Sequence, residues 1–135
     1  MMRSAARHRL RQDKAGSATV EFALALPILI LFFCGITASS LALFVQNSIK
    51  DAVSVGARHA TLSPTPTTSE VIAKVKGVSQ TDLTGTGSSV TVTAGTDSSG
   101  RSYYTITASR VYHFPLYPFT NRTVTLSATK RAYTG

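Results

Sequence analysis

The chain has 135 residues and a formal net charge of +8, so it is long enough for one modest domain and is rich in basic side chains. Five Lys or Arg lie in the first 16 residues beside one acid, and nine more are scattered over the other 119 residues beside five acids, without an aromatic-interleaved patch. This distribution does not indicate a nucleic-acid interface, so no nucleic-acid partner is expected. The single cysteine, Cys34, excludes an intrachain disulfide.

A basic segment opens the chain and ends at Gly16. Its basic side chains are Arg3, Arg7, His8, Arg9, Arg11 and Lys14. The positive-inside rule predicts that such a segment, next to a membrane-length apolar run, stays cytoplasmic. The lone carboxylate of Glu21 follows at the edge of that run, where an ionised group is costly and usually functional. This arrangement favours a leader of residues 1–16 that is removed by a cut between Gly16 and Ser17.

A long helix is predicted over residues 17–61, with a membrane span at about 22–45. No charged residue occurs from Phe22 to Ile49, and about 20 apolar residues suffice to cross the hydrocarbon layer. Three fates compete: an uncleaved signal anchor, a signal peptide removed near residues 38–40, and cleavage on the cytoplasmic side that leaves the helix attached. The length of the run favours the third. Pro27 lies inside this helix and removes one backbone hydrogen bond, either as a harmless kink or in a specific packing role.

The predicted helix continues past the membrane span with small residues on one face. Ala52, Gly56 and Ala60 are spaced four residues apart, which allows another helix to approach closely. The same face could instead pack on the protein's own sheet, and the sequence leaves both interpretations open. Pro64 and Pro66 end the helix.

The remaining residues, 62–135, predict a small extracytoplasmic α+β domain. Thr67 and Glu70 have capping-box spacing ahead of a short helix at about 68–77. Alternation of apolar and polar residues predicts three strands, around 90–94, 104–108 and 124–128, with a turn at 97–100 and an aromatic loop at 113–120. We therefore expect an α+β fold, in which a long N-terminal helix precedes a small antiparallel sheet with one short helix.

Catalytic chemistry is not indicated by the sequence. The three histidines, His8, His59 and His113, are far apart and lack metal-ligand spacing with Cys, Asp or Glu. No phosphate-binding glycine loop or nucleophile elbow is present. We expect no enzyme, no catalytic residue, no metal or cofactor and no small-molecule substrate.

Glu21 carries the main functional hypothesis. After a cut at Gly16, Ser17 would hold a positively charged α-amine and Glu21 would be the fifth residue of the new chain. A lone carboxylate in lipid costs roughly 2.5 kcal/mol or more, and pairing with the amine of a neighbouring chain would neutralise it and fix the register of the two helices. The alternative is a boundary carboxylate favoured by the helix dipole.

The segment from Gly16 to Pro27, GSATVEFALALP, resembles the signature of TadE-like proteins, which are pseudopilins of the tight-adherence (Flp-type IV) pilus system. Gly16 and Glu21 also resemble the general type IV prepilin site, and residues 52–60 resemble the segment that follows the membrane helix in this family. The resemblance covers about residues 11–60. Residues 36–39 depart from it, because many relatives carry an acid there, and the TadE and TadF branches both stay open.

This resemblance implies a processed minor pilin or pseudopilin that takes part in pilus assembly. A prepilin peptidase would cut at Gly16, with Glu21, Phe22 and Pro27 in the recognised segment. The implied location is the bacterial inner membrane, single-pass with a cytoplasmic N-terminus, with other pilin-like subunits and the assembly machinery as partners. The alternative is an uncleaved single-pass membrane protein with an extracytoplasmic binding module. A third possibility is a secreted β-domain released by ordinary signal cleavage.

Overall fold

The computed structural model describes residues 3–114 and 122–134, with side chains from residue 16 onward. The chain forms two compact units, Met1–Thr37 and Ala38–Gly135. The first unit contains the N-terminal part of helix α1 (Arg3–Leu62), and the second contains the rest of α1, helix α2 and a three-stranded sheet. The α+β fold predicted from the sequence is confirmed.

Helix α1 is continuous through Pro27 and ends where the sequence predicts. The backbone N–H of Ser63 donates to the carbonyl of His59 at 3.0 Å, and the chain then reaches Pro64, which cannot continue the helical hydrogen-bond pattern. Among the described residues, one helix, Gly16–Leu62, is long and apolar enough to cross a membrane. Only 6% of its most apolar window is buried by the rest of the chain, so this surface is left for other molecules to cover.

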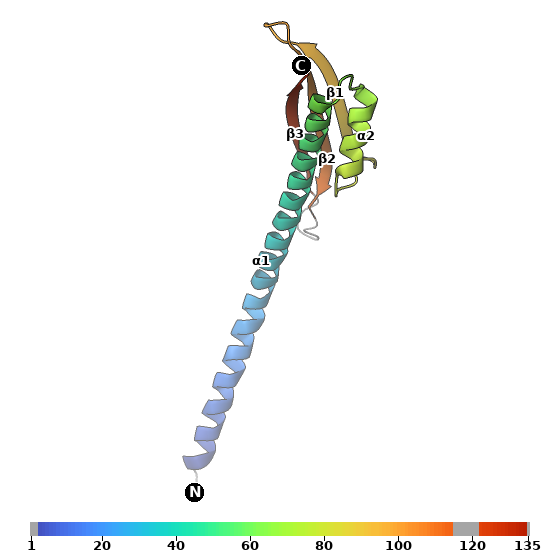
Figure 1. Ribbon diagram of the computed structural model, residues 1–135. Helices are drawn as coiled ribbons and strands as arrows, with labels where there is room; N and C mark the ends of the chain where they lie inside the picture. The colour runs from blue at the N-terminus through green and yellow to red at the C-terminus, as the bar shows by residue number, and fades with distance from the viewer. Residues whose placement is uncertain (1–2, 115–121, 135) are drawn as a thin grey trace. The chain divides into compact units, whose positions relative to one another are not determined.

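The sheet is antiparallel with strand order β1–β2–β3 (Figure 1). Its strands are β1 (Ser88–Thr96), β2 (Ser102–His113) and β3 (Thr123–Tyr133). All three are longer than the alternating cores predicted from the sequence. In an antiparallel ladder each added residue gains a partner, and β2 pairs with β3 from Tyr103↔Tyr133 to His113↔Thr123.

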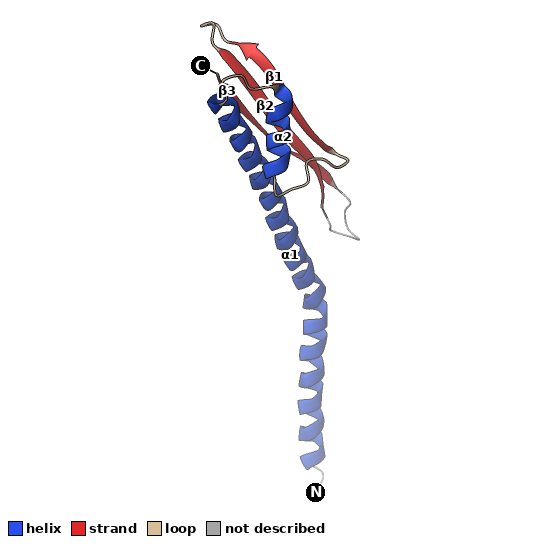
Figure 2. Ribbon diagram, turned by 45° about the vertical axis from the view of Figure 1, so that its right-hand side comes forward, coloured by secondary structure: helices blue, strands red, loops and turns tan. Residues whose placement is uncertain are grey.

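Both helices of the second unit cover the same face of the sheet, as Figures 1 and 2 show. The core between these layers consists of Ile49, Ala52, Val53, Ala57 and Ala60 of α1, Val71 and Val75 of α2, Leu83, Ile106, Ala108 and Ala132. Small residues dominate the α1 contribution, which lets the helix backbone lie close to the sheet. The other face of the sheet is solvated and carries mainly Ser and Thr.

Helix α2 (Thr68–Val78) begins at the capping box that the sequence predicts. The Glu70 backbone N–H donates to Thr67 Oγ1 at 3.3 Å, and the Thr67 N–H donates to Glu70 Oε2 at 3.1 Å. These bonds satisfy two N–H groups that have no partner within the helix. Val71 and Val75, one turn apart, turn the buried side of α2 toward the core.

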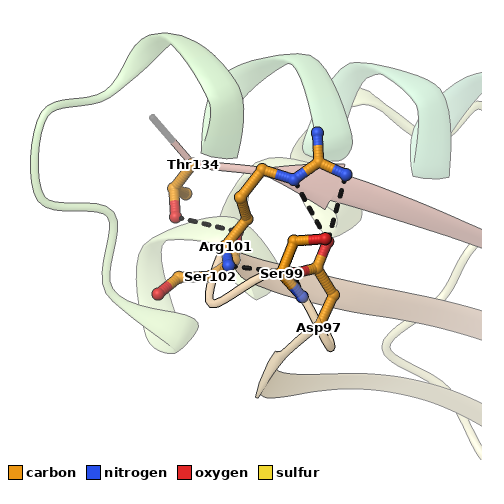
Figure 3. Close-up of polar contacts among 5 residues, drawn as sticks. All are labelled: Asp97, Ser99, Arg101, Ser102 and Thr134. Carbon is orange, nitrogen blue, oxygen red and sulfur yellow. Dashed lines mark hydrogen bonds and ion pairs between the residues drawn. The ribbon is translucent and has the colours of Figure 1, made fainter.

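The predicted turn at residues 97–100 joins β1 to β2 and is organised by one carboxylate (Figure 3). Asp97 Oδ1 accepts the backbone N–H groups of Ser99 and Arg101, each at 2.9 Å. Asp97 Oδ2 pairs with the guanidinium of Arg101 at 3.1 Å. Gly100 has φ +79°, in the left-handed region that glycine adopts without steric cost. Beside the turn, Thr134 binds the carbonyl of Ser102 and so ties the end of β3 to the start of β2.

The aromatic loop predicted at 113–120 is described only at its start. His113 is the last residue of β2, and the N–H of Phe114 donates to the carbonyl of Arg122 at 2.9 Å. The rest of that loop, from residue 115, lies outside the described residues.

Candidate processing and assembly site

Gly16 and Ser17 lie within α1, on an exposed part of the helix. A Cβ at Gly16 would meet no atom within 4 Å, so packing in the folded chain does not require glycine here. Helix propensity disfavours glycine by about 1 kcal/mol relative to alanine. Some requirement other than packing within this chain therefore accounts better for a glycine at this position.

Ser17 and Glu21 are brought together by one helical turn. Ser17 Oγ donates to Glu21 Oε1 at 3.3 Å, and both side chains are exposed. Among the described residues, Glu21 forms no ion pair with a basic side chain. Among the side chains that the structure describes, this carboxylate thus has a neutral hydrogen-bond donor and no basic partner.

Phe22 and Pro27 follow on the same exposed helix. Phe22 is 63% exposed, and with Leu26, Leu29 and Phe32 it lines a shallow apolar groove of about 310 Å³ along the helix surface. These four side chains recur at spacings of four, three and three residues, which places them in one stripe. Pro27 lies inside α1, between Leu26 and Leu29 of this stripe in the sequence.

The small residues Ala52, Gly56 and Ala60 belong to the second unit, apart from the Gly16–Phe22 segment in the first. Ala52 and Ala60 are fully buried in the core, and a Cβ at Gly56 would overlap Val75 Cγ2 of α2. Within the chain, this face is therefore occupied by α2 and the sheet.

A group of basic residues was missed by the sequence analysis. Arg58 of α1 lines a groove of about 380 Å³ together with Lys130 and Arg131 of β3. Arg131 and Arg101 also lie over the rings of Tyr103 and Tyr133. Basic residues that are scattered in the sequence are thus brought beside aromatic rings by the pairing of the strands. The adjacent Lys130–Arg131 pair in an acid-free strand was the available signal, but its partner is 72 residues away in sequence.

Two carboxylates outside the apolar helix have altered acidity. Hydrogen bonds from Thr67 lower the pKa of Glu70, and hydrogen bonds from Thr84 lower the pKa of Asp82. Both effects arise from local donors at a helix cap or turn, which favour the charged form of the acid. No group of three His, Cys, Asp or Glu side chains that could hold a metal ion occurs within the described part of the chain.

The comparison with protein families places the sequence match on the helix that carries this site. The model for TadE-like protein matches residues 16–58, which confirms the resemblance seen in the sequence. The matched residues lie within Gly16–Leu62, the stretch of α1 that is long and apolar enough to cross a membrane. No curated protein and no solved structure matches the chain.

Proposed function

Because residues 16–58 match the TadE-like family, we propose that this chain is a minor pilin or pseudopilin of a tight-adherence, Flp-type IV pilus. A prepilin peptidase removes residues 1–16 at the cytoplasmic face. The helix from Ser17 then anchors the protein in the inner membrane, with residues 62–135 on the extracytoplasmic side, until it joins other pilin-like subunits. The proposed role is structural, without catalysis or a cofactor.

One observation carries this proposal: within α1, a glycine and a serine, followed one turn later by a carboxylate, come directly before an unburied apolar stretch. Only 6% of the apolar window is buried, and Ser17 and Glu21 already lie within 3.3 Å of each other. A cut at Gly16 would add a positive α-amine next to this carboxylate. The apolar stripe through Phe22 would then contact the lipid or a neighbouring helix. Pairing of the Glu21 carboxylate with the amine of the neighbouring chain would fix the axial register of the two helices.

The processing step is tested by Gly16→Val in cells that possess a prepilin peptidase. A branched side chain at the residue before the cut should block cleavage, and mass spectrometry of the membrane fraction should find residues 1–16 still attached. Gly35→Val is the matched control, since a Cβ at Gly35 likewise meets nothing within 4 Å and lies in the same helix. Detection of Ser17 as the N-terminus of the Gly16→Val protein would refute processing at this site.

The pairing role of Glu21 is tested separately. Glu21→Ala should reduce incorporation into pili more than it reduces removal of the leader, because the carboxylate acts after the cut. Glu21→Gln retains a hydrogen-bond acceptor for Ser17 without the charge, so it should behave like Glu21→Ala if the charge matters. Normal piliation with Glu21→Ala, in a strain without other copies of the gene, would contradict the pairing role.

An uncleaved single-pass membrane protein with a binding module is the second candidate. It is favoured by the polar, solvated sheet face, which suits a binding surface. Intact residues 1–16 in wild-type protein from cells with an active prepilin peptidase would support it over the processed pilin.

A further inference from the structure

Every second residue of β1 turns its backbone N–H and C=O groups away from β2. The N–H of Val111 donates to the carbonyl of Gly87 at 2.8 Å, so residue 87 bonds across to β2. At the other end of β1, the N–H of Asp97 donates to the carbonyl of Arg101 at 2.9 Å. Bonding residues alternate in an antiparallel ladder, so the odd-numbered residues of β1 bond to β2 and the even-numbered ones point outward. Ser88 follows this pattern, because its N–H donates to a carbonyl of the preceding loop.

The outer edge of β1 is therefore formed by the backbone of Val90, Val92 and Ala94. Among the residues that the structure describes, none of these three makes a backbone hydrogen bond outside the ladder. Such an edge is a template for another extended chain, and proteins usually block it with charge, proline or a covering element. No charged residue and no proline occurs between Asp82 and Asp97. Helix α2 packs at β1 on the face of the sheet (Figure 2).

The opposite edge of the sheet, at β3, has the protection that β1 lacks. The N–H of Thr134 donates to β2, so the even-numbered residues of β3 bond to β2 and the odd-numbered ones point outward. The outward carbonyl of Ser127 is bound by Gln46 Nε2 of α1 at 2.9 Å. Lys130 and Arg131 place two charges in this edge strand. The sheet thus has one blocked edge, β3, and one edge that is open to a further strand, β1.

The side chains of β1 indicate which kind of strand fits this edge. Val90 and Val92 pack against the core but are only partly buried, whereas Thr91 and Thr93 are exposed on the solvated face. Side chains that lie directly opposite each other in an antiparallel pair share one face of the sheet. A strand with apolar β-branched residues on one face and hydroxyl residues on the other would therefore cover the valines and extend the hydroxyl face.

Strand direction argues against a second copy of this chain as the added strand. Gln46 bonds to Ser127 and Ser54 bonds to Lys130, so α1 and β3 run in the same direction. β1 also runs in that direction, because both edge strands are antiparallel to β2. Antiparallel pairing of β1 with β1 of a second copy would point the two α1 helices in opposite directions. Copies anchored in one membrane share the same orientation, so this step rests on the membrane anchor of the proposed function.

We propose that the outer edge of β1 binds an extended, uncharged segment of another protein as a fourth, antiparallel strand. The segment alternates β-branched apolar residues with threonine or serine, and it is held by backbone hydrogen bonds to Val90, Val92 and Ala94. Strand addition derives its affinity from main-chain hydrogen bonds and its specificity from alternate side chains. This goes beyond the proposed pilin role, because it gives residues 62–135 a partner-binding edge of their own.

A fluorescent peptide of residues 88–96 is the probe, because it has the required alternation and no α1 to fix its direction. Its binding to the full chain in phosphatidylcholine nanodiscs is followed by fluorescence anisotropy. N-methylation at residues 91 and 93 leaves the bonding edge of the peptide free, and this peptide should bind. N-methylation at residues 90, 92 and 94 blocks that edge and should weaken binding roughly tenfold or more. Equal binding of the two peptides, or no binding of the first, would overturn strand addition.

Proline substitutions locate the binding edge. Ala94→Pro removes an outward N–H without taking a bond from the β1–β2 ladder, so it should weaken binding of the first peptide roughly tenfold. Ala94→Val retains the N–H and should bind like the wild type. Thr125→Pro makes the same backbone change at an exposed, outward-pointing residue of β3 and should change binding less than about threefold. Equal weakening by Ala94→Pro and Thr125→Pro would overturn the assignment to β1.

Amide exchange in the wild type tests the same edge without any substitution. When the first peptide is bound, the amides of Val90, Val92 and Ala94 should exchange with solvent roughly tenfold more slowly. The amides of Thr91 and Thr93 already bond to β2 and should change little. Residue-resolved ¹H–¹⁵N spectra measure both sets. Unchanged exchange at the three outward amides in the complex would overturn the proposal.

Crosslinking in native membranes tests the second copy as the occupant. Thr93→Cys in a Cys34→Ser background should give no disulfide-linked dimer on oxidation, because β1 strands of copies in one membrane cannot pair in antiparallel fashion. A dimer that disappears when Ala94→Pro is added would show β1 pairing with itself and overturn the proposal. None of these readouts depends on the cut at Gly16 or on piliation, so this proposal and the proposed function fail separately.

Discussion

Gly56 is a position where the fold leaves no room for a methyl group. A Cβ there would overlap Val75 Cγ2, a short branched side chain that is itself fully buried and cannot swing aside. Gly16 and Gly77, in contrast, face open space. The reason for a glycine therefore differs between these positions. At Gly56 it is the close approach of α2, and at Gly16 and Gly77 packing gives no reason.

Gly56→Ala should therefore destabilise the protein despite the better helix propensity of alanine. Overpacking costs about 1–3 kcal/mol, and the propensity gain is about 1 kcal/mol, so a net loss of about 1 kcal/mol is expected. Gly77→Ala, with free space around it, should be neutral or stabilising. Urea unfolding followed by circular dichroism measures both, and Val75→Ala in the Gly56→Ala background should recover part of the loss.

Asp97 is the residue on which the β1–β2 turn depends. It accepts two backbone N–H groups and pairs with Arg101, and its side chain is 17% exposed. Asp97→Ala leaves both N–H groups to water and should cost about 1–3 kcal/mol, whereas Arg101→Ala removes a mostly exposed ion pair and should cost about 1 kcal/mol or less. Comparable thermal shifts for the two variants would contradict this ranking.

At the scale of elements, α2 shows how a short helix is fixed at its start. The Thr67–Glu70 box is recognisable in sequence because its residues lie three apart and act locally. The pKa of Glu70 is lowered in the folded chain, chiefly because the backbone N–H of Thr67 donates to its charged carboxylate. A folded pKa below the ordinary value of 4.5 means that the box stabilises the fold above that pH and stops doing so as pH falls through the folded pKa.

Glu70→Gln should accordingly have a pH-dependent effect. At pH 7 the variant should be less stable than the wild type, and the difference in unfolding free energy should shrink as the pH falls below 4.5 and through the lowered pKa of folded Glu70. Asp51→Asn, an exposed carboxylate on α1 outside any cap, is the control. If the difference in unfolding free energy between the wild type and Glu70→Gln stays constant over this pH range, the charge of Glu70 is not what stabilises the cap.

The elements predictable from sequence are those whose signals are local. Helix α1, its end near Pro64, the cap at Thr67 and the turn at Asp97 follow from spacing and from the chemistry of proline, threonine and aspartate. The ends of the strands were harder to predict from the sequence, because pairing with a neighbouring strand, rather than alternation alone, extends β2 to His113. The groove lined by Arg58 and Lys130 could not be predicted, since these two residues come to the same surface only once α1 packs beside β3.

At the scale of the molecule, α1 is a structural part of the folded domain as well as a membrane-capable helix. Of the eleven core residues found in the described part of the chain, α1 supplies five, among them the fully buried Ile49 and Val53. Full burial of such side chains contributes about 1.5–3 kcal/mol each, against a net stability of about 5–15 kcal/mol for a whole domain. The sheet and α2 alone therefore lack the apolar burial they need.

A fragment of residues 62–135 should be largely unfolded, whereas one of residues 46–135 should fold. The longer fragment retains the α1 core residues and the Gln46 side chain, whose Nε2 donates to the carbonyl of Ser127 at 2.9 Å. Amide dispersion in a ¹H–¹⁵N spectrum and a cooperative thermal transition distinguish the two outcomes. A cooperative transition in the shorter fragment would show that the α1 contribution is dispensable.

The hydrogen bond between Ser17 and Glu21 has a consequence for how long a subunit can wait before use. If the cut at Gly16 occurs, the new amine belongs to the same residue that already donates to this carboxylate, so an idle subunit holds both charges within one helical turn and stays in the bilayer as a zwitterion. Joining a neighbour then exchanges one partner for another, and the free energy gained is the difference between the two pairings. Under the proposed function, such an exchange would keep a pool of processed subunits stable in the membrane and would make their recruitment reversible until the apolar stripes of neighbouring helices pack together.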